Sequence, residues 1–236
     1  DDKLRRRCLR LISKICKARK IIPSSYILRQ ELVRITQYYH RGGFGDVSSG
    51  EYLGCPVAIK RLRMNERDSD KIFKRLCREI ISWKHLSHPN ILPLLGVSVS
   101  TGPYCFSILT EWMSNGTVMR YTRSNPEANR LQLLSQVAAG VVYLHELRVV
   151  HGDLKGAMKQ ANILVDNTGA ARVADFGLMA MADLSTNLLS ATDVSFGGTH
   201  CWMSPELLDP QCFDSNGRPT HESDCYALGM VVYEVS

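Results

Sequence analysis

A cluster of polar side chains between residues 151 and 177 has the types and the order that group transfer to a hydroxyl requires. The cluster reads His151-Gly152-Asp153-Leu154-Lys155, then Asn162, then Asp175-Phe176-Gly177. An aspartate can accept the proton of a hydroxyl group, and a lysine two residues later can neutralise an anionic group in transit. Asparagine and aspartate oxygens are hard ligands of the kind that Mg²⁺ prefers. These residues therefore predict transfer of a phosphoryl group from a metal-bound nucleotide.

The positive charge of the chain belongs to one short segment. The 236 residues carry a formal net charge of +6, but residues 1–20 hold nine Lys and Arg against two Asp. The other 216 residues hold 20 basic and 21 acidic side chains, so the remainder is close to neutral. This distribution argues against a nucleic-acid surface along the whole chain, and we expect no sequence-specific nucleic-acid partner.

The basic segment is itself predicted to be a helix over residues 3–20. Apolar residues recur three and four positions apart between the arginines and lysines: Leu4, Cys8, Leu11, Ile12 and Ile15. This spacing gives an apolar stripe on one side of a helix. Two interpretations stay open. The helix docks on an anionic membrane or on a partner, or it packs on the following domain with a solvated basic face.

Hydropathy and cysteine spacing indicate an intracellular chain. No apolar run approaches the roughly 18–20 residues that a transmembrane helix needs. The N-terminal segment lacks the apolar core and the cleavage site of a signal peptide. The eight cysteines form no C-x-x-C pair, so reduced thiols are a better interpretation than a disulfide framework or a zinc site. We therefore expect a cytoplasmic location, with the nucleus also open, and no transmembrane segment.

The elements that must position the polar cluster follow from the apolar periodicity. Glycine turns and short apolar runs predict strands over 32–63, 92–99 and 106–109. Apolar residues at helical spacing predict a helix over 69–85, an apolar helix over 131–147 and a last helix from near Asp224. Strands therefore dominate the first half of the chain and helices the second.

Taken in order, several motifs resemble the eukaryotic protein kinase domain, from about Ile35 to the end of the chain. The segment Arg41-Gly42-Gly43-Phe44-Gly45-Asp46-Val47 is similar to the glycine-rich loop, although His40 stands where the first glycine is usual. The segment Val57-Ala58-Ile59-Lys60 matches the strand whose lysine bridges the α- and β-phosphates. Glu79 matches the glutamate that pairs with this lysine.

The resemblance also gives roles to the cluster at 151–177. Asp153 would be the catalytic base and Lys155 the contact to the γ-phosphate, with Asn162 and Asp175 as the Mg²⁺ ligands. Lysine at this place is typical of serine/threonine kinases. The hinge and the segment 202–206 resemble the tyrosine-kinase-like group, and the sequence around Asp153 and Asn162 is similar to that of its fungal members. Gly152 replaces an arginine that normally pairs with a phosphate on the activation loop, so we expect another switch.

ATP, Mg²⁺ and protein substrates with Ser or Thr hydroxyls are the ligands that the resemblance implies. Thr110 falls at the gatekeeper position, directly before the hinge at 111–113. The implied ATP-binding residues are Gly42, Gly43, Phe44, Gly45, Val47, Ala58, Lys60, Glu79, Thr110, Glu111, Met113 and Leu164.

The implied fold is α+β and bilobal, protein-kinase-like, with a small antiparallel β-sheet lobe and a mainly helical lobe. We expect a basic N-terminal helical extension over 1–31 and a kinase domain over 32–236. The small lobe would span about 32–110, the hinge 111–113, and the large lobe would begin at about 114. The family's large lobe continues past the last helix, so we expect a C-terminally truncated fold. Glu206 would then be buried without its usual arginine.

One departure from the family bears directly on activity. Asp153 and Asn162 are nine residues apart, whereas the family has five. Reading residues 155–157 directly into Asn162 restores the motif, so 158–161 is a four-residue insertion. It either bulges outward or displaces Asn162, and a displacement of about 1 Å can cost on the order of 100-fold in rate. Two functions therefore stay open: an active ATP-dependent protein serine/threonine kinase, and a pseudokinase that binds nucleotide or partners without turnover.

Overall fold

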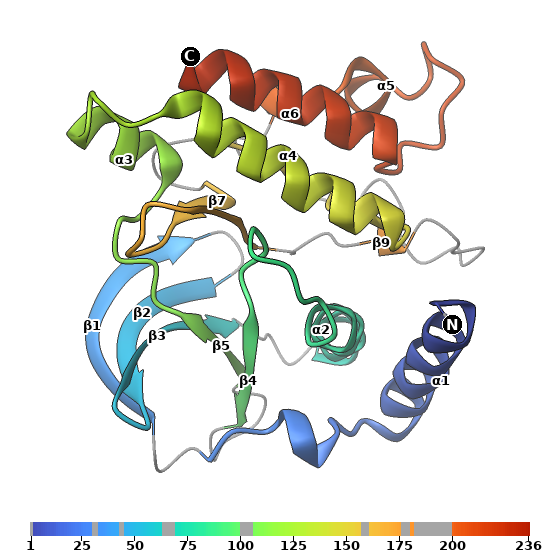
Figure 1. Cartoon of the computed structure of the whole chain (residues 1–236). Helices are drawn as coiled ribbons and strands as arrows, with labels where there is room; N and C mark the ends of the chain where they lie inside the picture. The colour runs from blue at the N-terminus through green and yellow to red at the C-terminus, as the bar shows by residue number, and fades with distance from the viewer. Residues whose placement is uncertain are drawn as a thin grey trace. The chain divides into compact units, whose positions relative to one another are not determined.

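The structure is a computed structural model of the chain. It describes residues 2–29, 33–42, 45–62, 69–99, 106–156, 161–175, 180–181 and 200–236. The chain divides into two compact units (Figure 1). The first consists of Asp1–Ser87 and Leu92–Trp112, and the second of His88–Ile91 and Met113–Ser236.

The first unit is built on a five-stranded sheet in which all neighbouring strands are antiparallel, in the order β1-β2-β3-β5-β4. The strands are β1 (Val33–Gly42), β2 (Gly45–Tyr52), β3 (Cys55–Leu62), β4 (Leu94–Val99) and β5 (Phe106–Glu111). The small antiparallel sheet that the sequence predicts is therefore confirmed, and strand β4 begins two residues later than expected.

The two faces of this sheet have different roles. Val57 and Ile59 of β3 are buried in an apolar cluster with Leu109 of β5. Because side chains alternate along a strand, Ala58 and Lys60 lie on the opposite face. Helix α2 (Ser69–Trp83) covers that opposite face. The ring of Phe73 in α2 lies 5.7 Å from the ring of Phe106 in β5. Phe106 is on the same face of β5 as Ile108, and Ile108 pairs with Lys60 of β3, so α2 lies on the face that carries Lys60.

The basic segment forms helix α1 (Asp2–Arg19), as predicted, and a short 3₁₀ helix η1 (Ser24–Tyr26) follows it. Helix α1 packs on α2. Cys16 of α1 and Cys77 of α2 are both buried. Burial, with the neighbouring Cys16 thiol as the second cause, raises the pKa of Cys77 to about 12. Packing on the following domain, one of the two interpretations of this segment, is therefore observed. Among the described residues, no helix is both long and apolar enough to cross a bilayer.

The second unit is mainly helical, with short two-stranded sheets. Its helices are α3 (Val118–Ser124), α4 (Arg130–Glu146), α5 (Pro205–Leu208) and α6 (His221–Val235), and a 3₁₀ helix η5 covers His200–Trp202. The paired strands are β6 (Val149–Val150) with β9 (Ala180–Met181), and β7 (Ile163–Val165) with β8 (Ala171–Val173). The prediction of a mainly helical second part is confirmed.

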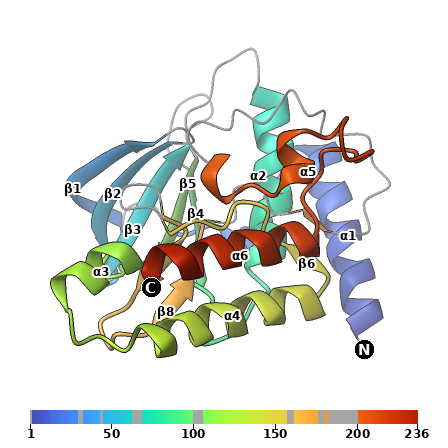
Figure 2. The same cartoon turned by 90° about the horizontal axis from the view of Figure 1, so that it is seen from above.

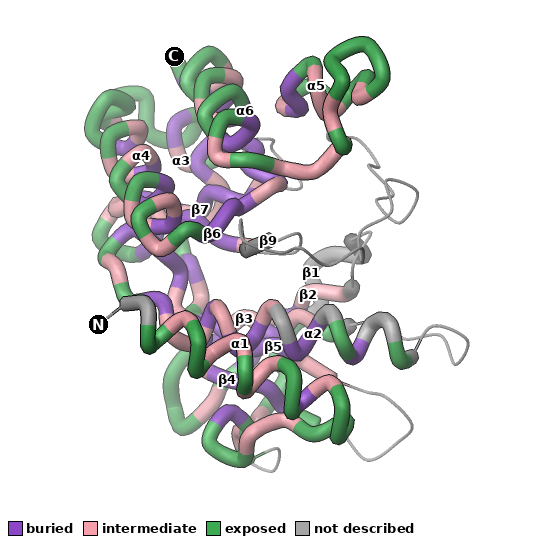
Figure 3. Tube along the Cα trace, turned by 90° about the vertical axis from the view of Figure 1, so that its right-hand side faces the viewer, coloured by how far each residue is buried: buried purple, intermediate pink, exposed green. Residues whose placement is uncertain are grey.

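Helices α4 and α6 lie side by side and run in opposite directions (Figure 2). Arg130 at the start of α4 donates to the carbonyl of Val235 at 3.2 Å. His145 at the other end of α4 contacts Asp224 near the start of α6 at 2.9 Å. Buried and exposed residues alternate around both helices, so each turns one side toward the core of this unit (Figure 3).

Two expectations for the C-terminal part need correction. Helix α6 begins at His221 rather than near Asp224, because Thr220 and Ser223 cap each other's backbone in a capping box. Glu206 is half-buried rather than buried without a partner. The Ser204 hydroxyl donates to Glu206 Oε1 at 2.6 Å.

Candidate active site

The backbone that leads into Asp153 is held by a buried carboxylate. Asp224 of α6 accepts two hydrogen bonds, from the N–H groups of His151 and Gly152, each at 2.8 Å. His145 of α4 contacts the same carboxylate. Gly152 has a backbone φ of 77°, a region that costs a residue with a Cβ about 1 kcal/mol or more. Glycine at the usual arginine position therefore fits the local backbone.

His151 connects two segments of the chain at the site. Its ring is fully buried, and Nδ1 accepts a hydrogen bond from the Asp153 N–H at 3.2 Å. Nε2 lies 3.0 Å from the carbonyl oxygen of Ala174. Because a carbonyl only accepts, Nε2 carries the proton and donates. His151 thus ties the segment before Asp153 to the segment before Asp175.

Asp153, Lys155 and Asn162 meet around one carboxylate oxygen. Lys155 Nζ lies 2.8 Å from Asp153 Oδ2 and forms a nearly buried ion pair with it. Asn162 Nδ2 donates to the same Oδ2 at 3.0 Å and also to the backbone carbonyl of Asp153. The structure therefore brings together three of the four residues that were predicted to act in the chemistry.

The insertion does not separate Asn162 from this group. The Asn162 N–H donates to the Lys155 carbonyl at 3.0 Å, and the Ala174 N–H donates to the Asn162 carbonyl at 2.7 Å. These two bonds fix the position of Asn162 from both sides. Residues 157–160 lie outside the described residues, but Lys155 and Asn162, which flank them, are joined by a hydrogen bond.

The side chains present fit a magnesium ion that arrives with a nucleotide. Asn162 Oδ1 is buried and accepts no hydrogen bond from the residues that the structure describes, so this oxygen could accept a cation. Asp175 follows β8 with φ of 58°, a conformation that aspartate tolerates better than most residues. No three His, Cys, Asp or Glu cluster as a metal site among the residues described. Magnesium at phosphates commonly takes only one or two protein ligands, so the pair suffices.

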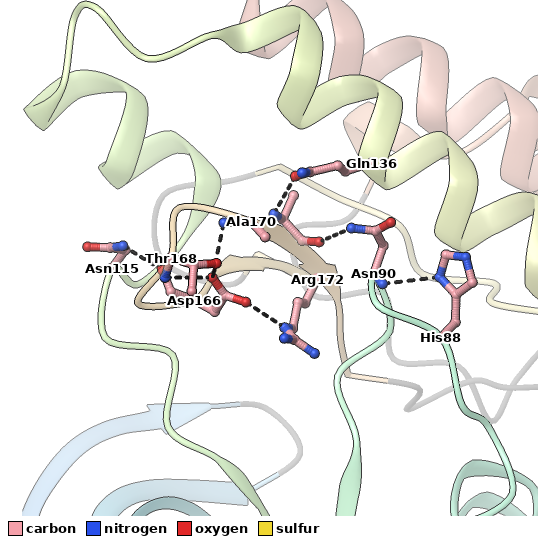
Figure 4. A network of polar contacts seen from close by, with 9 residues as sticks. His88, Asn90, Asn115, Gln136, Asp166, Thr168, Ala170 and Arg172 are labelled. Atoms are coloured by element: carbon pink, nitrogen blue, oxygen red, sulfur yellow. Dashed lines mark hydrogen bonds and ion pairs between the residues drawn. The ribbon is translucent and has the colours of Figure 1, made fainter.

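A polar network that the sequence analysis did not identify holds the β7–β8 hairpin (Figure 4). Asp166 accepts from the Thr168 hydroxyl at 2.7 Å, the Ala170 N–H at 3.0 Å and Arg172 Nε at 2.9 Å. Burial alone would raise the pKa of Asp166, but these hydrogen bonds together lower it. The hydrogen bonds therefore favour the ionised form of this carboxylate.

Distant side chains complete this network (Figure 4). Asn90 Nδ2 donates to the Ala171 carbonyl at 2.9 Å, and the Ala171 N–H donates to Gln136 Oε1 at 2.8 Å. Asn115 Nδ2 donates to the Asp166 carbonyl at 2.5 Å. Since Asn162 directly precedes β7 and Asp175 follows β8, the network fixes the spacing of the two predicted metal ligands. The turn residues Asp166-Asn167-Thr168-Gly169 were a signal that could have predicted the hairpin.

In the first unit, the sheet register groups several of the predicted nucleotide contacts. Val47 pairs with Lys60, and Ala58 pairs with Thr110. Paired residues share a face, so these four side chains lie on the face that α2 covers. Glu79 is a half-buried residue of α2. Gly42 and Gly45 pair at the end of the β1–β2 hairpin, whereas Gly43 and Phe44 lie outside the described residues.

The other residues predicted to contact the nucleotide lie in both units. Glu111 ends β5 in the first unit. Met113 is buried in the second unit, and Leu164 lies in β7 with a bridge to Thr117. Phe176 and Gly177 lie outside the described residues.

Comparisons with known proteins agree with this geometry. The family described as protein kinase domain matches residues 39–236. Probable serine/threonine-protein kinase kinX of Dictyostelium discoideum is 33% identical over 82% of this chain and 17% of its own length. Serine/threonine-protein kinase STY46 of Arabidopsis thaliana is 31% identical over 82% of this chain and 31% of its own. Serine/threonine-protein kinase CTR1 of Arabidopsis thaliana is 34% identical over 83% of this chain and 23% of its own.

The chain thus spans between 17% and 31% of the length of these three relatives. All three are named as kinases of the serine/threonine type, so the pseudokinase alternative finds no support among them. The match covers residues of both units, from within β1 to Ser236. The chain therefore belongs to the protein kinase family.

Proposed function

We propose that this chain transfers the γ-phosphoryl group of ATP to Ser or Thr hydroxyls of proteins, as a member of the tyrosine-kinase-like group. One observation carries the proposal. Asp153, Lys155 and Asn162 meet at a single carboxylate oxygen, with a buried and unpartnered Asn162 Oδ1 beside it. This arrangement joins a proton acceptor, a cation and a metal ligand within hydrogen-bond distance, as in-line phosphoryl transfer requires.

In this proposal Asp153 orients the acceptor hydroxyl and takes its proton as the hydroxyl oxygen bonds to the γ-phosphorus. The bond between that phosphorus and the bridging oxygen breaks, and ADP leaves with the electron pair. Lys155, held beside Asp153 at 2.8 Å, neutralises charge on the transferring group. Asn162 Oδ1 and Asp175 would hold Mg²⁺, which supplies charge neutralisation at the phosphates.

The nucleotide contacts follow the family. Lys60 would bridge the α- and β-phosphates and pair with Glu79, and the β1–β2 hairpin would cover the phosphates. The adenine would meet the hinge at 111–113, next to Thr110. We keep the division into an extension over 1–31 and a kinase domain over 32–236, with the small lobe ending near 110 and the large lobe beginning near 114.

The partners in this proposal are protein substrates, with no sequence-specific nucleic acid. The basic segment 3–20 adds an anionic membrane or a protein partner as two alternatives. We place the chain in the cytoplasm. The seven cysteines that the structure describes are all free thiols, which is typical of a reducing compartment.

Transfer of labelled phosphate from ATP to a generic protein substrate, followed by phosphoamino-acid analysis, tests the function. We expect label on Ser or Thr with the unchanged chain. Lys60→Ala and Asp153→Asn should each reduce transfer by at least about 100-fold, because each removes a group that acts on charge or proton in the transition state.

Asp209→Asn is the matched control for Asp153→Asn, since it removes an exposed carboxylate of the second unit and should leave transfer unchanged. Melting temperatures verify that the variants fold. Full activity in Asp153→Asn would remove this residue from the role of base. Binding of ATP without any transfer by the unchanged chain would instead make it a pseudokinase.

A further inference from the structure

Helix α1 has two faces with different surroundings. Its inner face holds it to the first unit. Cys16 is buried there, Lys20 Nζ forms an ion pair with Asp70 Oδ1 of α2 at 2.7 Å, and Arg5 donates to the His85 carbonyl. The Tyr26 hydroxyl, just after the helix, lies 2.8 Å from His85 Nε2. These contacts fix α1 as a part of the first unit.

The segment that follows α1 is tied to the sheet. The Leu28 N–H donates to the Val97 carbonyl of β4 at 2.8 Å, and Ile27 forms a parallel bridge with Val97. Gly96 allows this close approach, because a Cβ there would lie 2.7 Å from the Tyr26 carbonyl oxygen. Helix α1 therefore meets the rest of the unit at both its inner face and its C-terminal end.

The outer face of α1 carries an apolar stripe in solvent. Leu4, Leu11 and Ile15 are 60%, 58% and 55% exposed. They are spaced seven and four residues apart, which puts them within roughly 40° around the helix axis. Cys16 lies about 100° further round, on the inner side. The apolar residues of this helix are thus divided between a face that packs on α2 and a face that has no protein against it among the described residues.

Basic side chains flank the exposed stripe. Arg7 and Lys14 lie on one side of it and Arg19 on the other, and all three are exposed. Residues 1–20 carry seven net positive charges, whereas the remainder of the chain carries one net negative charge. A ligand that matches this face therefore offers negative charge directly beside an apolar surface.

We propose that the outer face of α1 docks on an anionic lipid membrane, with Leu4, Leu11 and Ile15 inserted between headgroups and Arg7, Lys14 and Arg19 at the phosphate level. A lipid interface supplies hydrocarbon and anionic headgroups side by side, and this is the arrangement that an amphipathic basic helix recognises. An acidic protein would satisfy the charges but would need a matching apolar groove. The inner face stays packed on α2, so docking holds the whole first unit at the membrane.

Vesicle sedimentation without nucleotide tests the inference independently of catalysis. The 236-residue chain is mixed with phosphatidylcholine vesicles or with vesicles that also contain phosphatidylserine. We expect tighter binding to the phosphatidylserine vesicles. Each of Arg7→Gln and Lys14→Gln should weaken this binding by about fivefold. The double variant Leu11→Gln/Ile15→Gln should weaken it by at least about tenfold.

The matched control is Leu131→Gln/Val142→Gln, which removes two apolar side chains from α4 that are 78% and 56% exposed. This variant should bind as the unchanged chain does. Equal binding to both vesicle types would overturn the proposal, as would an equal loss in the α4 variant or no loss in the Leu11/Ile15 variant. Binding to polyglutamate but not to vesicles would assign the face to an acidic protein instead. Circular dichroism of each variant verifies that its helices remain.

Discussion

Asn162 Nδ2 lies 3.0 Å from Asp153 Oδ2, although the two residues are nine apart in the sequence. The Asn162 N–H also donates to the Lys155 carbonyl at 3.0 Å, so Lys155 and Asn162, which flank residues 156–161, are held together. The four additional residues therefore do not keep the side chains of Asp153 and Asn162 apart. Activity should depend on this closure rather than on the number of residues in the loop.

Deletion of residues 158–161 is the direct test of the closure. The shortened chain joins Ala157 to Asn162 and recovers the spacing of the family. Because the two ends are already held together, we expect kcat to change by less than about tenfold, well below the 100-fold that a displacement of about 1 Å can cost. Phosphate transfer to a generic substrate, measured at saturating ATP and Mg²⁺, gives kcat for both chains.

Replacement of 158–161 by four Gly and Ser residues is the control, because it keeps the length and removes the side chains. We expect it to match the unchanged chain. A rise of 100-fold or more on deletion, on the scale of a misplaced reacting group, would mean that the insertion displaces Asn162 in solution.

Asn162→Ala and Asn162→Asp separate metal binding from loop closure. Both retain the backbone bond to Lys155, but only the aspartate keeps an oxygen in place of Oδ1. We expect Asn162→Ala to raise the Mg²⁺ concentration for half-maximal rate and to lower kcat by about 100-fold. Asn162→Asp should recover part of the rate at high Mg²⁺, since a carboxylate is a hard ligand. A Mg²⁺ titration of initial rates gives both quantities, and identical titrations for all three chains would exclude Asn162 as a ligand.

Much of the fold was predictable, because its elements are long and periodic. The helix expected over 3–20 is Asp2–Arg19, and the helix expected over 69–85 is Ser69–Trp83. Each has an apolar residue every three or four positions. The strand with Lys60 was predictable from the apolar run 57–59 and from its match to the family's strand, and Val57 and Ile59 lie on the buried face.

The hairpin beside the site could not be predicted in the same way. Strands β7 and β8 have three residues each, too few for a period. Their position depends on Asn90, whose side chain bonds Ala171 from 81 residues away. Such contacts depend on the folded chain rather than on local pattern. The side-chain position of Asn162 depends likewise on two backbone bonds, to Lys155 and to Ala174.

Replacing Asp224 should lower the free energy of unfolding more than replacing His145, which contacts the same carboxylate. Asp224→Ala leaves the buried N–H of His151 and the half-buried N–H of Gly152 without an acceptor, and we expect a loss of about 3 kcal/mol in the free energy of unfolding. Asp224→Asn keeps one acceptor oxygen and should lose less. His145→Ala removes only a side-chain contact, about 1 kcal/mol. Urea unfolding of the three variants gives the order, and equal losses would contradict the assignment of the backbone bonds.

The stability of the β7–β8 hairpin should depend on pH through Asp166. Its pKa in the folded chain is lowered, so folding favours the ionised carboxylate. The stabilisation is therefore complete above the pKa of the unfolded chain, about 3.9, and is lost as the pH falls through that value toward the lower folded pKa. The unchanged chain should be more stable than Asp166→Asn at pH 7, and the difference should shrink below about pH 5.

Arg172→Gln removes one of the hydrogen bonds that lower the pKa of Asp166, so the unchanged chain should show a steeper loss of stability with acid than this variant. Urea unfolding of the three chains at several pH values measures the effect. A difference between the unchanged chain and Asp166→Asn that stays constant with pH would show that the carboxylate charge does not hold the hairpin.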